Sequence, residues 1–317
     1  MRILLIGLVV AALPLVAQGQ FTEEAQDKGP KLDQTSTTRI KIGVVVKASG
    51  GLLHHIVATA AVPREWPEQK VQIVDEDTNS SVQSLHYQPL GGGVTQMVVE
   101  VPQLPAGSEA KALVTYEVTR RTMVAPTNTG NYKIPKKLDR QLTLYVGSSP
   151  FIESRHPKII AAAKEAVEKA SSESDWKKVE AIYDWTREHV AYKQGELKGA
   201  ARALIDKEGD TDELASVFIA MCRAQKIPAR TVFVPGHCYA EFYLEDDDGK
   251  GHWFPCQPAG VRSFGGIDER RPILQKGDNY KNPENPKERL RYLREFFTGA
   301  SRGGQPKVSF VCDIVGE

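Results

Sequence analysis

The hydrophobic pattern of the chain changes near residue 148, from short strand-like runs to longer helical stripes. Before this point, short runs rich in Val, Ile, Thr and Tyr alternate with clusters of Gly, Ser, Asn, Asp and Pro, a pattern typical of β-strands joined by turns. Several strands at this spacing predict an antiparallel β-sandwich. The runs are RIKIGVVVKA (39–48), HHIVATAAV (54–62), KVQIVDE (70–76), TQMVVEVPQL (95–104), AKALVTYEVTRR (110–121) and QLTLYVG (141–147).

Beyond residue 148, apolar residues recur at helical spacing and predict helices over 157–170, 175–192 and 210–225. Pro157 suits the first turn of the first helix. Strand-like runs follow at 229–236, 237–245 and 252–257, so helices come first and a small antiparallel sheet second. This order predicts an α+β domain. The stripes consist of Trp176, Val179, Ile182, Tyr183, Thr186 and Val190, then Leu214, Val217, Phe218, Met221 and Cys222.

The C-terminal part is less regular. Residues 265–286 are rich in Gly, Pro, Asn and Asp and predict a surface excursion. Residues 287–298 (KERLRYLREFFT) predict one more helix, and PKVSFVCDIV at 306–315 predicts a last strand. We therefore expect a β-sandwich domain over 37–147 and an α+β domain over 148–317.

The first nineteen residues have the pattern of a secretory signal peptide. Arg2 precedes an apolar run from Ile3 to Ala12, Pro14 interrupts it, and Ala17-Gln18-Gly19 supplies small residues for cleavage. The run is shorter than the roughly 20 apolar residues that span a bilayer. We expect residues 1–19 to be removed, residues 20–36 to form a flexible lead-in, and the mature protein to be soluble and secreted or periplasmic.

Composition narrows the classes of partner. The chain has 41 basic and 40 acidic residues and is 41% hydrophobic, so it is neither basic enough to indicate nucleic acid or a membrane surface as partner nor polar enough to be disordered. The triple glycine at 91–93 lacks the Lys and Ser/Thr of a phosphate-binding loop. His54 and His55 are neighbours on a predicted strand and point to opposite faces. We expect no metal and no organic cofactor.

The candidate chemistry lies between Gly209 and Gln257. Asp210 can cap the predicted helix, with Glu213 completing a capping box. Thr211 then takes the first helical position, where free N–H groups and the helix dipole stabilise an anion. His237 opens a strand, and Gln257 ends the strand that returns beside it on the same face.

Four motifs in this segment resemble those of the transglutaminase-like superfamily, from about Ile159 to Pro258. They are Gly209-Asp210-Thr211-Asp212-Glu213-Leu214-Ala215, Lys226-Ile227-Pro228-Ala229-Arg230, His237-Cys238-Tyr239-Ala240-Glu241-Phe242-Tyr243 and Trp253-Phe254-Pro255-Cys256-Gln257. The segment 181–192 resembles the helix that precedes the family's nucleophile, and the preceding β-sandwich suits the secreted bacterial type. The resemblance implies a papain-like fold with a Cys-His-Asp centre.

Two of the three implied catalytic residues are substituted. Thr211 occupies the position of the family's cysteine and Gln257 that of its aspartate, whereas His237 matches. The resemblance places Tyr239, Glu241 and Trp253 in the cleft. For Glu241 the alternative is a structural ion pair with Arg230. An internal threonine needs a separate general base, because its hydroxyl pKa far exceeds the value near 8.5 of a thiol.

Three functions stay open. The first is a degenerate domain whose cleft binds a peptide, protein or cell-wall polymer. The second is a working acyl transferase or amide hydrolase in which Thr211 attacks and His237 serves as base. The third is a structural or adaptor protein whose biology lies in the sandwich.

The cysteines predict one disulfide. A pairing that sets His237 opposite Gln257 also sets Cys238 opposite Cys256, with Cα atoms about 4.5–5.5 Å apart, within disulfide range. Export would permit this bond; the alternative is two thiols packed in the core. Cys222 lies on an apolar helical stripe and is expected to be a core side chain, and the pattern assigns no role to Cys312.

Overall fold

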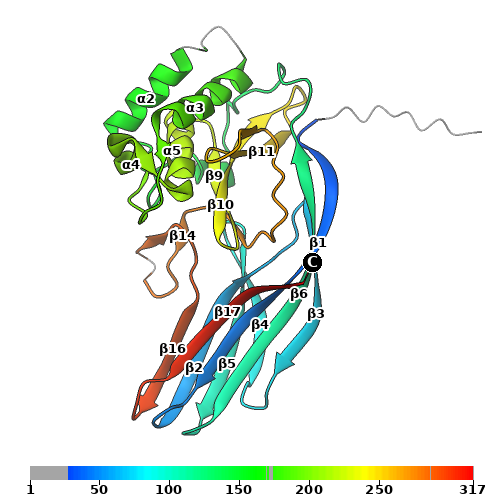
Figure 1. The fold of residues 1–317 in the computed structure, drawn as a ribbon, viewed down its shortest axis with the longest axis vertical. Helices are drawn as coiled ribbons and strands as arrows, with labels where there is room; N and C mark the ends of the chain where they lie inside the picture. The colour runs from blue at the N-terminus through cyan, green and yellow to red at the C-terminus, as the bar shows by residue number, and fades with distance from the viewer. Residues whose placement is uncertain (1–27, 169, 171–173, 286, 317) are drawn as a thin grey trace, which may run out of the picture.

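The computed structural model describes residues 28–168, 170, 174–285 and 287–316, so the predicted signal peptide lies outside the described residues. A long β-sandwich forms one end of the molecule, and helices packed on a smaller sheet form the other (Figure 1). The expected α+β class with antiparallel sheets is confirmed. Within the described residues, no helix has both the length and the apolar character needed to cross a membrane.

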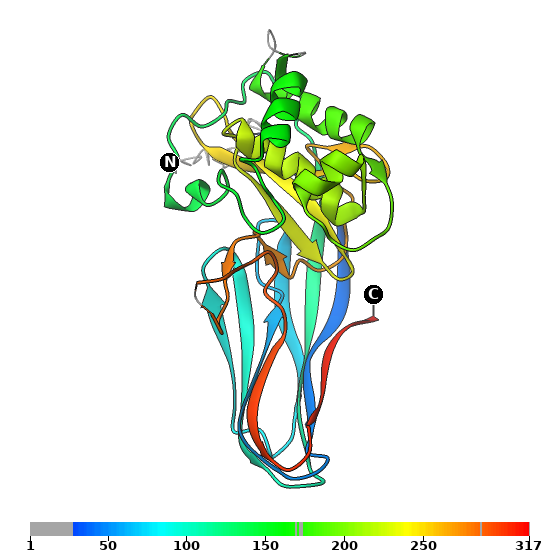
Figure 2. The same cartoon turned by 90° about the vertical axis from the view of Figure 1, so that its left-hand side faces the viewer.

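The sandwich consists of two four-stranded antiparallel sheets, seen edge-on in Figure 2. One sheet has the order β17-β1-β6-β3, with β1 (Lys31–Lys47), β3 (Gln69–Thr78), β6 (Glu109–Val124) and β17 (Lys307–Gly316). The other has the order β16-β2-β5-β4, with β2 (Leu52–Val62), β4 (Ser84–Leu90), β5 (Val94–Leu104) and β16 (Phe296–Arg302). Alternate residues of facing strands fill the core between the sheets, among them Ile40, Ile42, Val44, Val46, Val114, Tyr116 and Val118.

Both ends of the described chain differ from the sequence-based expectation. β1 begins at Lys31, inside the predicted lead-in of 20–36, because its backbone pairs with β6 from Lys31–Val124 onward although its first side chains are mostly exposed. At the other end, β16 pairs with β2 and β17 pairs with β1. Residues 296–316 therefore belong to the sandwich, and the predicted second domain of 148–317 is too long.

Two predicted elements are wrong. Residues 287–298 form no helix: they contribute the short β15 (Arg289–Leu290) and the start of β16. The sheet edge that β2 offers outweighs the helix propensity of this charged segment. Residues 141–147 form no strand, because Asp139 accepts the N–H of Leu142 at 2.7 Å and caps the single-turn α1 (Arg140–Thr143).

The second part packs four helices and a five-stranded sheet around one core (Figure 1). The helices are α2 (Pro157–Glu168), α3 (Asp175–His189), α4 (Ala200–Asp206) and α5 (Thr211–Ala224). The sheet has the order β12-β11-β10-β9-β13, with β9 (Ala229–Val234), β10 (His237–Glu245), β11 (Gly251–Gln257), β12 (Ser263–Phe264) and β13 (Gln275–Lys276). Two short pairs complete it: β7 (Ala191–Tyr192) with β8 (Glu208–Gly209), and β14 (Tyr280–Lys281) with β15. The central α5 covers β10 at Ala240, Phe242 and Leu244.

The expected surface excursion of 265–286 is buried over much of its length. Ile273, Leu274, Gln275, Lys276 and Asp278 are each at most 4% exposed. Their polar groups find partners far away in sequence, which the local composition does not reveal. This segment carries β13 between the sandwich and the second part of the molecule.

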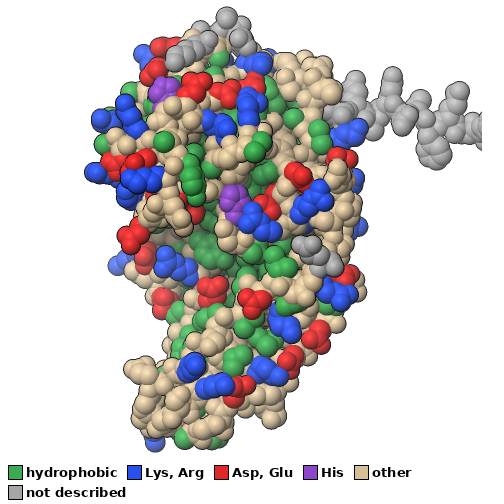
Figure 3. Space-filling model, in the orientation of Figure 1, with side chains coloured by type: hydrophobic (Ala, Val, Ile, Leu, Met, Phe, Trp, Pro, Cys, Tyr) green, Lys and Arg blue, Asp and Glu red, His purple; other side chains and the backbone are tan. Residues whose placement is uncertain are grey.

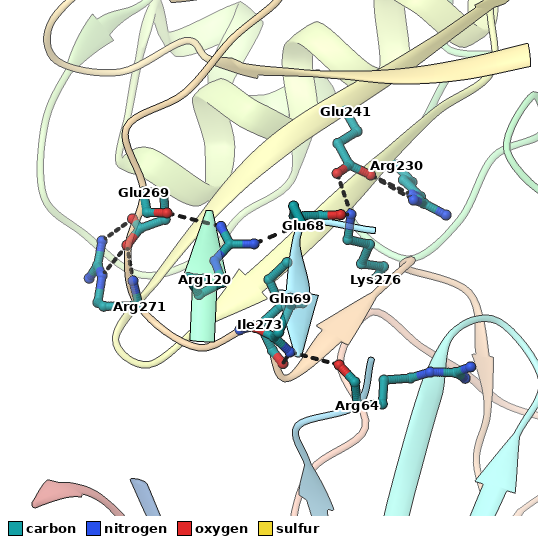
Figure 4. A network of polar contacts seen from close by, with 10 residues as sticks. All are labelled: Arg64, Glu68, Gln69, Arg120, Arg230, Glu241, Glu269, Arg271, Ile273 and Lys276. Carbon is teal, nitrogen blue, oxygen red and sulfur yellow. Dashed lines mark hydrogen bonds and ion pairs between the residues drawn. The ribbon is translucent and has the colours of Figure 1, made fainter. Parts of the chain in front are cut away.

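A buried network of ion pairs joins the two parts (Figure 4). Nζ of Lys276 lies 2.5 Å from Glu68 of the sandwich and 2.6 Å from Glu241 of β10. Glu241 also accepts two guanidinium N–H groups of Arg230, at 2.7 and 2.8 Å. Arg120 of β6 lies 3.7 Å from Glu68 and donates to the carbonyl of Glu269. Charge complementarity, and not apolar contact alone, therefore fixes how the parts sit together.

Candidate functional site

The start of α5 is built as a capped, rigid platform. The carboxylate of Asp210 accepts the N–H groups of Asp212 and Glu213 at 2.8 and 3.1 Å, and Glu213 accepts the N–H of Asp210 at 2.8 Å. This is the predicted capping box. Gly209 is required next to it, because a Cβ there would lie 2.5 Å from the Cβ of Glu213. Thr211 is thereby held at the first helical position.

His237 and Gln257 meet across the β10–β11 hairpin. Nε2 of His237 lies 3.2 Å from Oε1 of Gln257. With the amide oxygen as acceptor, Nε2 carries the proton and Nδ1 keeps a lone pair for a general base. Papain-like proteases also use an amide in this orienting role. Gln257 can therefore set the tautomer, although it adds no charge to stabilise an imidazolium.

Helix α3 holds the segment behind Gln257. The hydroxyl of Tyr183 donates to the carbonyl of Gln257 at 2.8 Å and accepts the N–H of Ser263 at 2.9 Å. Arg187 donates to the carbonyls of Pro258 and Gly260 at 2.7 and 2.8 Å. These bonds fix the end of β11, and with it the side chain that faces His237.

A second set of contacts ties the start of α5 to the start of β10. The thiol of Cys238 donates to Oδ1 of Asp212 at 3.1 Å, and Arg291 donates to the same oxygen at 3.0 Å. Arg291 also donates to the hydroxyl of Ser216 at 2.6 Å. The residues that follow Thr211 and His237 in sequence are thus bonded to each other, and this brings the two motifs together. Sequence reasoning missed Arg291 because it assigned this segment to a helix.

Thr211 itself makes no side-chain hydrogen bond within the described part of the chain, to His237 or to any other group. Its side chain is half-buried. The structure therefore brings His237 and Gln257 into contact and places Thr211 at the helix start, without a hydrogen bond that would activate its hydroxyl.

The environment of His237 favours the neutral ring. Burial lowers the pKa of His237 below its ordinary value, and the nearby cation of Arg271 lowers it further, against a smaller opposing effect of Glu269. Arg271 donates to both carboxylate oxygens of Glu269, at 2.9 and 2.6 Å, so the two stay together beside the histidine. An unprotonated imidazole is the form that a general base requires.

We expect His237 to titrate below the value near 6.5 of an unperturbed histidine. Because the unfolded chain then binds more protons than the folded one, His237 makes stability fall as pH drops below about 6.5. NMR titration of the imidazole, with His237→Gln to assign its signal, measures the midpoint. A midpoint at or above 6.5 would contradict this picture.

The three predicted cleft residues do not lie together in one cleft. Tyr239 and Glu241 are fully buried, and Glu241 is bound by Arg230 and Lys276, so the structural ion pair named as its alternative is present. Trp253 lies towards the other end of the hairpin, where the guanidinium of Arg230 stacks on its ring at 3.9 Å. Neither Tyr239 nor Glu241 is therefore open to a ligand.

The predicted Cys238–Cys256 disulfide is wrong: both thiols are free and buried. The register pairs Ala240 with Cys256, two residues away from the expected pairing. His237 reaches Gln257 diagonally, which long side chains on neighbouring strands can do. Burial raises the pKa of both thiols well above the usual value, so neither supplies a thiolate in place of the family's cysteine.

A groove of about 630 Å³ runs beside the start of α5. Asp212 and Phe233 line it together with residues 282–284 and 288–296, which include Arg291 and Tyr292. The ring of Phe233 packs edge-to-face on Tyr292, with centroids 5.0 Å apart. The groove thus combines aromatic rings with charged groups next to Asp212. Asp212 in turn accepts a hydrogen bond from Cys238, on the strand that carries His237.

Comparison with known proteins supports the resemblance. Residues 160–258 match the model of the transglutaminase-like superfamily. The chain therefore contains a transglutaminase-like domain. Its motifs coincide with the capped start of α5 and the β10–β11 hairpin described above.

One solved structure shares the overall fold of this chain. A "putative cysteine protease" from Cytophaga hutchinsonii has a TM-score of 0.56 and 16% identity, over 90% of this chain and 95% of that one. A "putative protease" from Parabacteroides distasonis has a TM-score of 0.29 and 13% identity, over 67% of this chain and 42% of that one. No curated protein matches the chain. The first similarity shows a shared fold alone.

Proposed function

We propose that the transglutaminase-like domain is a non-catalytic binding module that holds an extended peptide or polymer segment in the groove beside α5. The observation that carries the proposal is Thr211, which takes the place of the nucleophile without a hydrogen bond to His237. A hydroxyl in this position needs a base engaged with it at the moment of attack. The rest of the centre, His237 with its orienting amide, remains assembled.

The groove supports the choice of ligand. Consecutive residues 288–296 line the groove, which suits an extended chain, and Phe233 and Tyr292 offer aromatic surface for apolar side groups. Charged side chains of both signs line the groove, so polar groups of either sign can be matched; they are Glu284, Glu288, Arg289, Arg291, Arg294 and Glu295. We further propose that the protein acts outside the cytoplasm, as the pattern of residues 1–19 indicates.

Thr211→Cys tests the statement that the domain is non-catalytic because of the residue at position 211. A thiol at a helix start that an imidazole can reach has its pKa lowered, to roughly 3.5–7.5 in comparable settings, and would supply a thiolate at neutral pH. We expect no turnover by the wild type and turnover by Thr211→Cys at least about 100-fold above background, the lower end of what a positioned base contributes. The assays are amine incorporation into a glutamine-rich protein and hydrolysis of a mixed peptide pool.

The double variant Thr211→Cys/His237→Gln is the matched control and should lose the gained activity. Turnover by wild type that disappears in both Thr211→Ala and His237→Ala would overturn the proposal and make Thr211 a nucleophile. A third outcome is a Thr211→Cys variant that folds but shows neither turnover nor alkylation by iodoacetamide faster than that of a free thiol. This result would show that His237 does not activate a nucleophile at position 211.

A further inference from the structure

A second cavity, of about 670 Å³, lies at the junction of the sandwich and the transglutaminase-like domain. The sandwich side contributes Arg64, Trp66 and the turn of residues 91–93, and the domain side contributes Arg230, Tyr243 and Trp253. Neither Thr211, His237 nor Gln257 lines it. His237 begins β10 whereas Tyr243 and its partner Trp253 lie near the far end of the hairpin, so the two places are separate.

Aromatic rings form one wall of this junction cavity. Trp253 packs edge-to-face on Tyr145 and Tyr243, with centroids 5.5 and 5.2 Å apart. The guanidinium of Arg230 stacks on Trp253 at 3.9 Å, and that of Arg64 on Trp66 at 4.9 Å. Stacking of this kind fixes the plane of each guanidinium, which prepares it for a planar, bidentate anion.

The cavity has an excess of positive charge. Arg64, Arg140 and Arg230 line it, against the single carboxylate of Asp139. One oxygen of Asp139 is used to cap α1, and Arg230 is already paired with Glu241. Among the residues that the structure describes, neither Arg64 nor Arg140 forms an ion pair. Two guanidinium groups are thus available to an anionic ligand.

Gly93 brings the β4–β5 turn close to Trp66 and Lys276. A Cβ on Gly93 would lie 2.9 Å from the ring of Trp66 and 2.7 Å from the carbonyl of Lys276, and the backbone of Gly93 has a φ of 89°. Only glycine lets the β4–β5 turn approach this closely. The buried network behind Arg230 ties the same region together through Lys276 and Glu68, so the cavity is held open by fixed elements (Figure 4).

We propose that the junction cavity binds a carboxylate-bearing saccharide. The half-buried ring of Tyr243, on which no cation of the described residues stacks, suits the C–H face of a sugar ring, and Arg64 and Arg140 suit the carboxylate. The volume lies within the range of about 300–1,000 Å³ of small-ligand pockets. On the face drawn in Figure 3, which is not the face of this cavity, hydrophobic side chains gather where the two parts of the molecule meet, with charged groups around them. Binding here is independent of Thr211 and of the proposed peptide groove.

Titration calorimetry with trigalacturonic acid as probe tests this assignment. We expect binding by the wild-type protein, binding at least about tenfold weaker in Arg64→Gln and in Arg140→Gln, and no binding of the neutral galactose trimer of equal length. Arg302→Gln removes an exposed charge from β16 and should bind as the wild type does.

Several results would overturn the assignment. Inorganic phosphate or acetate that binds as tightly as the trimer would reduce the site to a simple anion site. Equal binding of the neutral trimer, or no binding of trigalacturonic acid at millimolar concentration, would exclude the proposed ligand class. A loss in Arg302→Gln as large as in Arg64→Gln would place binding elsewhere. Thr211→Cys should leave binding of the trimer unchanged.

Discussion

Replacing Glu241 by glutamine is expected to destabilise the protein by about 3–5 kcal/mol, the usual cost of removing one partner from a buried ion pair. Glu241 is fully buried and accepts from Lys276 at 2.6 Å and from Arg230 at 2.7 Å. The variant would leave two buried cations to share the remaining carboxylate of Glu68, which already faces Arg120. Urea unfolding of wild type and variant measures the difference.

The pH dependence gives the same prediction a second readout. Burial raises the pKa of Glu241, but Lys276 and Arg230 outweigh it and hold the pKa below its usual value. The folded state therefore binds fewer protons, and the contribution of Glu241 is present above about pH 4.3 and is lost as pH falls through the folded pKa. Glu241→Gln should lose this part of the acid dependence.

Glu117→Gln is the matched control for this network. Glu117 pairs with Arg39 at 2.9 Å, but the two side chains are 31% and 57% exposed. An exposed pair contributes about 0–1 kcal/mol. If Glu241→Gln cost no more than Glu117→Gln, the buried network would not hold the two parts of the molecule together.

Asp278→Asn is expected to have an effect of similar size, about 3–5 kcal/mol. Both carboxylate oxygens of Asp278 lie 2.8 Å from one guanidinium nitrogen of Arg223, and both side chains are fully buried. Ser149 and the N–H of Thr231 also donate to this carboxylate, at 2.7 and 3.1 Å. The amide keeps the shape of the side chain and removes the charge that neutralises Arg223 in the core.

Asp268→Asn serves as its control, since Asp268 pairs with Arg270 at 3.0 Å on the same segment but is 72% exposed. We expect a change below about 1 kcal/mol there. Thermal unfolding followed by circular dichroism distinguishes the two variants. Equal midpoints for Asp278→Asn and the wild type would mean that the carbonyls of Ala229 and Gly147 and the hydroxyl of Ser149 are sufficient partners for Arg223.

The local pattern of apolar and polar residues was sufficient to predict α2, α3 and α5, because the apolar stripe and the end signals of each helix lie within its own sequence. It failed at residues 265–298. Asp278 and Lys276 read as loop residues, yet their charges are matched by Arg223, Glu241 and Glu68, which are distant in sequence. Residues 287–298 read as helix, yet the last three of them begin β16, which pairs with β2. The secondary structure and burial of such segments depend on pairing with residues distant in the chain. A single sequence does not show which residues pair.

In the candidate site, too, some features could be predicted from the sequence and others could not. The contact of His237 with Gln257 follows from the motifs, as does the position of Thr211 at a helix start. The motifs do not predict the register of the hairpin. His237 and Gln257 can touch whether they are directly opposite or diagonal, and the sequence is the same in both cases. That two-residue difference separates Cys238 from Cys256. Arg291, which bonds Asp212 beside Thr211, had no local signal at all.

The return of β16 and β17 to the sandwich makes the transglutaminase-like domain an insertion, anchored at both ends between β6 and β16. No single cut of the chain separates the two parts, because a truncation before residue 296 removes one strand from each sheet. A free-standing sandwich would instead need residues 125–295 excised and β6 rejoined to β16 by a linker. A pulling force applied through the two ends of the chain would load the β1–β17 pair first and leave the inserted domain shielded from it.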